Sequence, residues 1–326
     1  MKRDAVVAIV GDVHGHLQLA CCVLARWQQE LGVRFEAVLL CGDVGTFTDA
    51  SQLDSATRAH AKSNPCELEF LHQWSTKPQA PWLDAIFKPE ADDGLGLACP
   101  LIMVHGNHEG FSHLERLLPG QTPEEPVELT DLPGVDTNGH LRLLPSGCIV
   151  SLASGHLVAG IGGIEPGQRR AEYHSMAMID DLAILNVLER GPVDILVTHQ
   201  GPSGVQGDKG APSLQVLLDQ GIARVWFHGH SIAVSEPTRA GRAAGTLVVP
   251  LGDIAFRAPA RTPRAERCEP GDGGWAIAWL REHEIVVDKS PPPFLREFHR
   301  RRWTRKDELL IAPSLAPSAW RTATGK

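Results

Sequence analysis

The sequence lacks any apolar run long enough to cross a membrane. Among its 326 residues, no uninterrupted apolar segment approaches the ~20 residues that a bilayer-spanning helix needs. The opening stretch MKRDAVVAIV places basic residues before apolar ones, but the apolar part ends at Gly11-Asp12 and is too short for a signal peptide. We therefore expect a cytoplasmic protein with no membrane partner.

Cysteine pairs of the kind that hold a structural zinc ion are also missing. The 7 cysteines are scattered, their number is odd, and no two of them form a C-x-x-C pair. Disulfide frameworks have an even set of cysteines at regular spacings, and structural zinc modules need paired cysteines. The cysteine pattern therefore argues against both kinds of structure.

The chain has no excess of positive charge. Lysine and arginine together number 31, aspartate and glutamate together number 39, and the formal net charge is -8 at pH 7. A broad surface that coats nucleic acid is therefore not expected. A local basic patch or a bound pair of divalent cations could still reverse the field at one place, so phosphate-bearing substrates are not excluded.

What the sequence does contain is a series of buried strands that alternate with helices. Apolar runs that end in turns predict strands at 5–10, 37–40, 101–104, 194–197 and 224–227. Helical spacing of apolar residues predicts helices at 17–31, 176–190 and 213–220. Shorter runs predict later strands at 148–152, 157–161, 246–250, 275–280 and 284–288. This alternation predicts an α/β fold, a mixed-sheet β-sandwich flanked by helices.

The predicted buried strands end in polar residues of the types that bind divalent metals. The segments are Gly11-Asp12-Val13-His14-Gly15, Gly42-Asp43, Gly106-Asn107-His108-Glu109, Thr198-His199 and His228-Gly229-His230. Ligand groups of an α/β sheet collect outside the carboxyl ends of its strands, so these segments can converge on one crevice. Residues i and i+2 of an extended chain share a face, so Asp12 and His14 can point to the same side, and so can His228 and His230. Each segment alone is a weak signal, but the series predicts a metal site.

Taken in order, these segments resemble the calcineurin-like metallophosphoesterases, whose pattern reads D-x-H, G-D, G-N-H-E, H and G-H-x-H. The match runs from Asp12 to His230. This spread implies one catalytic domain at 1–289, to which the later strands belong. Segment 46–98 is then an inserted, cap-like element, and the Pro-rich and basic residues 290–326 form a C-terminal tail.

The resemblance implies a dinuclear metal site. One ion would be held by Asp12, His14, Asp43 and His230, and the other by Asp43, Asn107, His199 and His228. Mixed carboxylate, amide and imidazole ligands suit manganese, iron or zinc rather than calcium. Two such ions, with Asp43 as the bridge, would lower the pKa of a bridging water for in-line attack on phosphorus. Asn107 would also contact the substrate.

The resemblance further implies a role for His108, which matches the family histidine that contacts phosphate and assists the leaving group. With the catalytic Asp43, it is the candidate general acid. The alternative is a hydrogen-bonding residue that only supports the site. A non-catalytic, metal-stabilised binding scaffold is the rival function, but a scaffold has no need of His108.

Some branches of the family fit less well. The protein Ser/Thr phosphatase branch resembles G-D-x-V-D-R-G and R-G-N-H-E. This chain instead reads Asp43-Val44-Gly45-Thr46 at the first motif and has His105 before Gly106, so neither arginine is present. The guanidiniums that clamp phosphate in these branches are therefore missing. A Ser/Thr-type protein phosphatase or a dinucleoside polyphosphate hydrolase is thus less favoured and is kept as the alternative.

A looser resemblance is to RNA lariat debranching enzymes and their bacterial relatives. It rests on Gln79-Ala80-Pro81, Ile161-Gly162-Gly163-Ile164-Glu165 and Gly201-Pro202-Ser203-Gly204. It suggests Arg169, Arg170 and His174 as substrate-binding residues and favours a nucleotide or single-stranded nucleic acid as substrate. Debranching enzymes typically have cysteine where this chain has Asp12, a harder ligand that favours the ordinary two-metal site. In the tail, Trp303 could stack on a base, although a solvated tail is the simpler interpretation.

Overall fold

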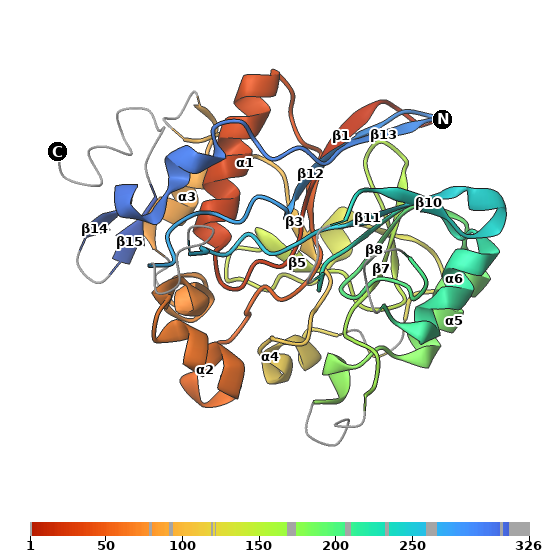
Figure 1. The fold of residues 1–326 in the computed structure, drawn as a ribbon, viewed down its shortest axis with the longest axis horizontal. Coiled ribbons are helices and arrows are strands. Elements are labelled where there is room, and N and C mark those ends of the chain that lie inside the picture. The colour runs from red at the N-terminus through yellow and green to blue at the C-terminus, as the bar shows by residue number, and fades with distance from the viewer. Residues whose placement is uncertain are drawn as a thin grey trace.

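Two β-sheets lie face to face in the computed structural model, with helices on their outer faces (Figure 1). The structure describes residues 2–77, 80–90, 94–118, 120, 122–167, 174–205, 210–231, 235–258, 266–306 and 309–312. The predicted mixed-sheet α/β sandwich is confirmed. Among the described helices, none has the length and apolar character that spanning a bilayer requires.

The first sheet has six strands in the order β13-β12-β1-β2-β3-β5. Their bounds are β1 (Ala5–Val10), β2 (Ala37–Leu40), β3 (Leu101–Met103), β5 (Leu141–Leu143), β12 (Trp275–Leu280) and β13 (Ile285–Asp288). β1, β2, β3 and β5 run parallel, whereas β12 and β13 pair antiparallel with their neighbours. The carboxyl ends of the parallel strands therefore lie at one end of this sheet.

The second sheet has seven strands in the order β10-β11-β9-β8-β7-β6-β4. Their bounds are β4 (Val127–Glu128), β6 (Ile149–Ser151), β7 (Leu157–Ile161), β8 (Val193–Thr198), β9 (Ala223–His228), β10 (Thr238–Ala240) and β11 (Thr246–Pro250). β7, β8, β9 and β11 run parallel and form its centre. A separate pair joins β14 (Thr304–Lys306) and β15 (Leu309–Ile311).

The apolar runs of the central strands are explained by burial on both faces. Val7 and Ile9 of β1 belong to the core between the sheets, together with Phe227 of the second sheet. Ala8 and Val10, on the opposite face of the same strand, belong to a second core under the helices. Because successive side chains point to opposite faces, a strand buried on both sides has apolar residues throughout.

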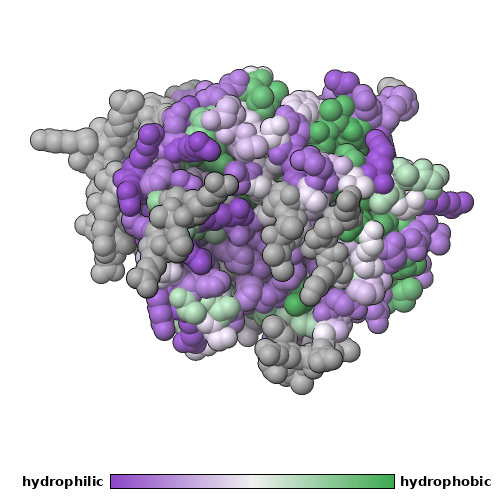
Figure 2. All heavy atoms as spheres, in the orientation of Figure 1, coloured by the Kyte–Doolittle hydropathy of each residue, from purple (hydrophilic) through white to green (hydrophobic). Residues whose placement is uncertain are grey.

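Helices cover the two outer faces (Figure 1). Their bounds are α1 (Leu17–Leu31), α2 (Ser55–Ala61), α3 (Pro81–Phe87), α4 (Phe111–Glu115), α5 (Asp181–Arg190) and α6 (Gln215–Gln220), with a π-helical turn at Phe70–Trp74. Short 3₁₀ turns occur at Ala50–Gln52, Pro65–Leu68, Leu129–Asp131, Ser175–Ala177, Pro212–Leu214, Arg242–Ala244, Leu295–Phe298 and Arg300–Arg302. The face seen in Figure 2 is largely hydrophilic, in keeping with apolar residues that are gathered between these layers.

The helix predicted at 176–190 is shorter than expected. Ser175–Ala177 forms a 3₁₀ turn, and α5 begins only at Asp181. Asp180 caps α5, because its side chain accepts a hydrogen bond from the backbone N–H of Leu182. An N-cap residue has non-helical backbone angles, so the helix cannot extend across it.

The described part of the segment 46–98 packs against the first sheet's helical layer rather than apart from it. Phe70 and Trp74 are completely buried in the core that also contains residues of α1. The backbone N–H of Gln18 donates to Glu69 Oε1 at 2.6 Å. A Cβ atom at Gly15 would lie 2.2 Å from the carbonyl oxygen of Cys66, so the segment rests directly on the loop after β1.

Much of the described C-terminal region is also part of the core. Phe298 is 1% exposed, and Trp303 packs edge-to-face on Phe256 with ring centroids 5.4 Å apart. The Trp303 indole N–H donates to the carbonyl of Phe298 at 3.0 Å. The hypothesis that Trp303 stacks on a nucleic-acid base is therefore wrong, because its ring is buried within the protein.

Candidate metal centre and active site

The polar segments predicted from the sequence lie at the carboxyl ends of neighbouring strands. Asp12 follows β1, Asp43 follows β2, and Asn107 follows β3, while His199 and His228 stand at the ends of β8 and β9. The first three strands are adjacent in one sheet, and β8 and β9 are adjacent in the other. The sandwich therefore brings these residues together from both sheets.

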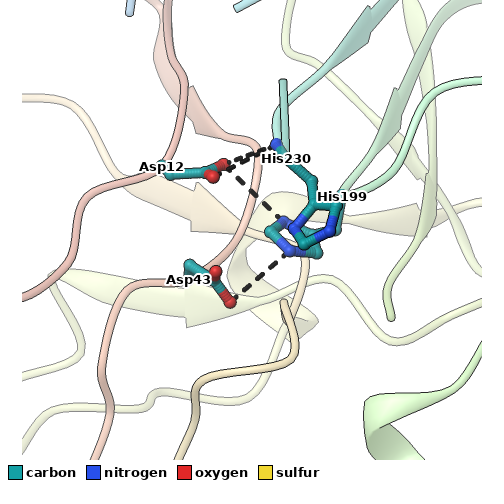
Figure 3. Close-up of side chains that lie close together, drawn as sticks. All are labelled: Asp12, Asp43, His199 and His230. Atoms are coloured by element: carbon teal, nitrogen blue, oxygen red, sulfur yellow. Dashed lines mark hydrogen bonds and ion pairs between the residues drawn. The ribbon is translucent and has the colours of Figure 1, made fainter. Parts of the chain in front are cut away.

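Four of the predicted metal ligands form a tight group (Figure 3). Ligand atoms of Asp12, Asp43, His199 and His230 all lie within 4.8 Å of one another. The backbone N–H of His230 donates to both carboxylate oxygens of Asp12, at 2.9 and 3.1 Å. His199 Nε2 lies 3.5 Å from Asp43 Oδ1. A single cation could be reached by side chains from both sheets.

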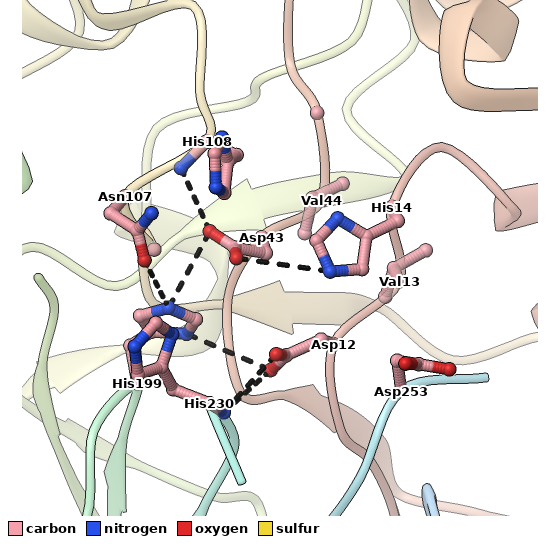
Figure 4. A network of polar contacts seen from close by, with 12 residues as sticks. Asp12, Val13, His14, Asp43, Val44, Asn107, His108, His199, His230 and Asp253 are labelled. Atoms are coloured by element: carbon pink, nitrogen blue, oxygen red, sulfur yellow. Dashed lines mark hydrogen bonds and ion pairs between the residues drawn. The ribbon is translucent and has the colours of Figure 1, made fainter. Parts of the chain in front are cut away.

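Two more predicted ligands, His14 and Asn107, adjoin this group (Figure 4). His14 Nε2 lies 3.9 Å from Asp43 Oδ2. Asn107 Oδ1 lies 3.0 Å from His199 Nε2. His228 is buried and pairs in register with Thr198, the residue directly before His199. Six of the seven predicted metal ligands thus lie around one place, and His228 stands at the end of β9, two residues before His230.

The chemistry of this group fits a bound cation. Asp12 and Asp43 are both buried, and within the described part of the chain neither carboxylate is paired with a lysine or arginine. Burial, together with the charge of Asp43, raises the pKa of Asp12 well above its ordinary value. Burial also acts to raise the pKa of Asp43, but the neighbouring histidines, His199 foremost, hold it below its ordinary value. Buried carboxylates of this kind are stabilised by metal coordination.

The orientation of His199 supports the same conclusion. Its Nδ1–H donates to the carbonyl of Cys41 at 2.8 Å, and burial lowers its pKa to about 4. In the neutral ring this leaves a lone pair on Nε2, which faces the carboxylate of Asp43. Two electron-pair donors facing each other repel unless a cation lies between them. Histidine ligands in metal sites are commonly oriented by a carbonyl in this way.

The backbone is strained where it presents these side chains. His14, Asp43 and His230 have φ values of 44°, 45° and 50°, in the left-handed region that is unfavourable for residues other than glycine. Each such residue costs of order ~1–3 kcal/mol and persists only where the surroundings enforce it. Glycines permit close approach to both carboxylates, because a Cβ atom at Gly106 would lie 2.1 Å from Asp43 Oδ1 and one at Gly229 would lie 2.1 Å from Asp12 Oδ1.

Glu109 holds the loop that carries Asp43. Its carboxylate accepts hydrogen bonds from the backbone N–H groups of Val44 at 2.8 Å, Gly45 at 3.0 Å and Thr46 at 2.9 Å, and from the Thr46 hydroxyl at 2.7 Å. Burial and the charge of Asp43 raise its pKa to about 7. Sequence reasoning assigned Glu109 no role, although its place in the G-N-H-E motif was a signal.

His108 is fixed at both its backbone and its ring. Its N–H donates to Asp43 Oδ1 at 2.8 Å, and ring Nδ1 donates to Asp54 Oδ2 at 2.9 Å. Burial opposes the charged form, but the hydrogen bond to Asp54 and the charges of Asp43 and Asp54 raise the pKa of His108 to about 9. Asp54 was missed by sequence reasoning, because nothing in its local pattern points to His108.

A groove of about 1170 Å³ leads away from this centre. It is lined near the metal ligands by His108 and farther along by Glu236, Asp253, Arg257, Asp272, Asp288 and Lys289. Arg257 is paired with Asp253 at 3.2 Å and lies 3.8 Å from Asp272. The Lys289 ammonium donates to the carbonyl of Ser235, and burial lowers its pKa.

Asp253 is a second residue that sequence reasoning missed. It follows β11 directly after Gly252, and the backbone N–H of Ile254 donates to the Asp12 carbonyl at 3.0 Å. Figure 4 shows it beside Asp12 on the wall of the groove. The signal was available, because a Gly-Asp pair after a buried strand is the same pattern that identified Asp43.

Among the predicted substrate-binding residues that the structure describes, Asn107 lies at the metal centre and His174 does not line the groove. Arg169 and Arg170 lie outside the described residues. His174 stacks on Phe111, with ring centroids 4.9 Å apart, and its Nε2 lies 3.4 Å from Glu115 Oε1. Among the described residues that line the groove, His174 does not appear.

Comparisons with known proteins match residues 5–233 to the family described as calcineurin-like phosphoesterase. No curated protein matches the sequence. Among solved structures, TT1561 of Thermus thermophilus is 12% identical with a TM-score of 0.46, covering 88% of this chain and 99% of that chain. GAP50, the anchor in the inner membrane complex of Plasmodium, is 12% identical with a TM-score of 0.43, covering 94% and 91%. A novel phosphatase from Mycoplasma pneumoniae is 12% identical with a TM-score of 0.39, covering 90% and 96%. These distant structural likenesses carry no argument about substrate.

Proposed function

The chain belongs to the calcineurin-like phosphoesterase family and is thus a metal-dependent phosphoester hydrolase, and we propose that it works with a pair of divalent ions. One ion would be held by Asp12, His14, Asp43 and His230, and the other by Asp43, Asn107, His199 and His228. The observation that carries the proposal is the buried pair Asp12 and Asp43, which has histidines beside it but no lysine or arginine partner within the described chain.

The ligand types narrow the choice of ion to manganese, iron or zinc, because imidazole and carboxylate are combined without thiolate. Such ions, when bound, supply Lewis acidity to the phosphoryl oxygens and lower the pKa of water. The protein's own task is then to hold the ester and to provide a proton.

His108 is the residue that we propose as the proton donor. Its Nδ1 is occupied by Asp54, and the ring lines the groove beside the metal ligands. As the bond between phosphorus and the leaving oxygen breaks, Nε2–H would transfer its proton to that oxygen. The imidazole is then neutral and regains a proton from solvent. General acids of this kind typically contribute about 10²–10⁴-fold to the rate.

The charges of the groove favour a small ester over a long polyanion. Beyond the metal ligands, the described lining carries Glu236, Asp253, Asp272 and Asp288, and its cations Arg257 and Lys289 already have partners. Like charges would repel the successive phosphates of a strand. Of the substrates that the sequence favours, a nucleotide phosphodiester or phosphomonoester therefore fits better than single-stranded nucleic acid.

The proposal can be tested with metal-stripped protein reloaded with Mn²⁺, Fe²⁺ or Zn²⁺. We expect p-nitrophenyl phosphate or bis(p-nitrophenyl) phosphate to be hydrolysed only after reloading, with about two ions bound per chain as dinuclear sites require. Asp49→Asn, outside the site, serves as the control. Full activity of the stripped protein would refute the proposal.

A panel of substrates tests whether the enzyme prefers a nucleotide to single-stranded nucleic acid. Cyclic nucleotides, nucleoside monophosphates, single-stranded RNA and DNA, and branched RNA should be compared at increasing salt. For a strand, log KM should change with log salt by about 0.7 per phosphate contact, whereas a nucleotide should show little dependence. Preference for RNA, DNA or branched RNA with a steep salt dependence would contradict the choice of a nucleotide.

A further inference from the structure

We propose that a basic surface beside the active site, formed by Lys62, Arg267 and the turn Arg300–Arg302, binds a second phosphate group of the substrate. This inference rests on the proposed function, and it narrows the substrate to a nucleotide ester that carries a further phosphate. The three arginines of the turn belong to the basic block after residue 290. Composition suggested only a solvated tail there, whereas the structure joins this block to two other segments of the chain.

The basic surface is assembled from three segments that contact one another. The Arg300 guanidinium donates to the carbonyl of Ser63 at 3.2 Å, and the Arg300 backbone N–H donates to the carbonyl of Cys268 at 2.8 Å. Arg301 Nε lies 3.4 Å from Glu266 Oε2. The end of α2, the loop 266–268 and the turn Arg300–Arg302 are therefore neighbours, although Ser63 and Arg300 lie 237 residues apart in the chain.

Positive charge predominates on this surface. Glu266, which pairs with Arg301, is the one acidic residue in the segments 60–63, 266–268 and 300–302. Lys62, Arg267 and Arg302 are exposed, and within the described part of the chain they form no ion pair. The whole chain has a net charge of -8, so this surface is a local exception that can attract an anionic group.

Helix α2 connects the basic surface to the active site. Asp54, the N-cap of α2, has its Oδ2 atom 2.9 Å from Nδ1 of His108. The helix has 7 residues and Lys62 is its C-cap. A helix of this length spans about 10 Å, because each residue adds 1.5 Å. The basic surface therefore begins about 10 Å from the residue that contacts His108.

The electrostatic surroundings of His60 show the same proximity. His60 lies in the last turn of α2. Burial lowers the pKa of His60, and the positive charge of Arg267 acts in the same direction. The imidazoles of His14 and His108, which line the groove at the metal centre, lower it further. One histidine is thus close to both the basic surface and the active site.

These positions fit a substrate with one phosphate at the metal centre and another over the basic surface. The groove itself carries the carboxylates of Glu236, Asp272 and Asp288, and none of the cations of the basic surface is among the described residues that line it. A second phosphate is therefore repelled along the groove and attracted toward α2. Trp303, directly after the turn, is buried and presents no ring to a base. The group recognised is thus a phosphate, on a neighbouring nucleotide or in a polyphosphate chain.

Kinetics with matched substrates on metal-loaded protein test the proposal. The thymidine dinucleotide TpT has one phosphate, whereas TpTp and pTpT carry a further phosphate at one end. One of the two should exceed TpT in kcat/KM on the order of twentyfold, chiefly through a lower KM, because exposed ion pairs contribute about threefold each. A preference found only for diadenosine tetraphosphate over diadenosine diphosphate would instead assign the second phosphate to a polyphosphate chain.

Three substitutions remove unpaired cations from the basic surface. Lys62→Gln, Arg267→Gln and Arg302→Gln should each lower the preference for the second phosphate about threefold, and the triple variant should abolish it. Arg34→Gln is the matched control, because Arg34 is exposed and precedes the amino end of β2, at the end of the sheet away from the metal centre. A preference that survives in the triple variant, or that falls equally in Arg34→Gln, would overturn the proposal.

A binding measurement without turnover keeps this inference separate from the proposed function. Inorganic tripolyphosphate, titrated calorimetrically into metal-free protein at low salt, should bind the wild type and Arg34→Gln alike and the triple variant on the order of twentyfold more weakly. Equal affinities of the wild type and the triple variant would refute the basic surface as a phosphate site. Hydrolysis of esters without any preference for a second phosphate would refute this inference alone, whereas hydrolysis of no ester by the metal-loaded wild type would refute the proposed function.

Discussion

Replacement of the buried Glu69 by glutamine should change how the stability of the protein depends on pH. Glu69 is 3% exposed, and within the described part of the chain its carboxylate accepts from the Gln18 N–H and the Trp74 indole, both at the same oxygen, Oε1. Glutamine can keep both bonds with its own Oε1. The substitution therefore removes the titration of this carboxyl group while leaving its contacts in place.

The size of the effect on the free energy of unfolding follows from the raised pKa of the Glu69 carboxyl group. Burial raises the pKa of Glu69 from 4.5 to about 8. A folded-state pKa above the unfolded value means that stability is fully present below pH 4.5 and is lost as pH rises through 8. Between pH 5 and pH 8, this single group should reduce the free energy of unfolding by about 3–4 kcal/mol, since each unit of difference corresponds to ~1.4 kcal/mol.

Urea unfolding at pH 5 and at pH 8, followed by tryptophan fluorescence, measures the effect. Glu69→Gln should match the wild type within about 1 kcal/mol at pH 5 and exceed it by about 3 kcal/mol at pH 8. Glu30→Gln, which alters an exposed carboxylate of α1, is the control and should leave the pH dependence unchanged. Parallel stability curves of the wild type and Glu69→Gln would show that the buried carboxyl group does not titrate as its surroundings require.

Three further predictions concern the site and the core. Asp43→Asn should lower the bound metal measured by elemental analysis and abolish ester hydrolysis, because the carboxylate proposed to bridge the two ions would be lost; retained metal and activity would contradict this role. Gly106→Ala should weaken metal binding at least tenfold in a titration, since its Cβ would lie 2.1 Å from Asp43 Oδ1. An unchanged affinity would show that the loop after β3 can move to accommodate the added methyl group. Phe298→Ala should destabilise the fold by about 3–5 kcal/mol in urea unfolding, as expected for a fully buried ring; a loss below about 1 kcal/mol would place Phe298 outside the core.

The amino-acid composition of the C-terminal region is a misleading guide to its burial. Prolines and arginines after residue 290 are typical of a solvated tail, and the segment does contain exposed arginines. The apolar residues between them, Phe294, Phe298 and Trp303, nevertheless fill the core beside α1. Burial of a few side chains depends on what the rest of the fold leaves uncovered, and local composition does not contain this information.

The sequence by itself determined the strands of this protein and the residues of its candidate metal site. Strands such as β1 and β12 could be predicted with their bounds, because burial on both faces leaves a continuous apolar run. The gathering of Asp12, Asp43 and His199 could also be predicted, since parallel strands bring their carboxyl ends to one edge.

Only the tertiary structure decided the partners of those residues. The contact of Asp54 with His108 joins positions 54 residues apart in the chain, and that of Gln18 with Glu69 joins positions 51 apart. Such contacts depend on how the segment 46–98 packs over the first sheet. The periodicity of apolar residues in the sequence does not predict that packing. Side-chain types and spacing set which residues can bind a metal, whereas the three-dimensional arrangement sets which carboxylate contacts His108.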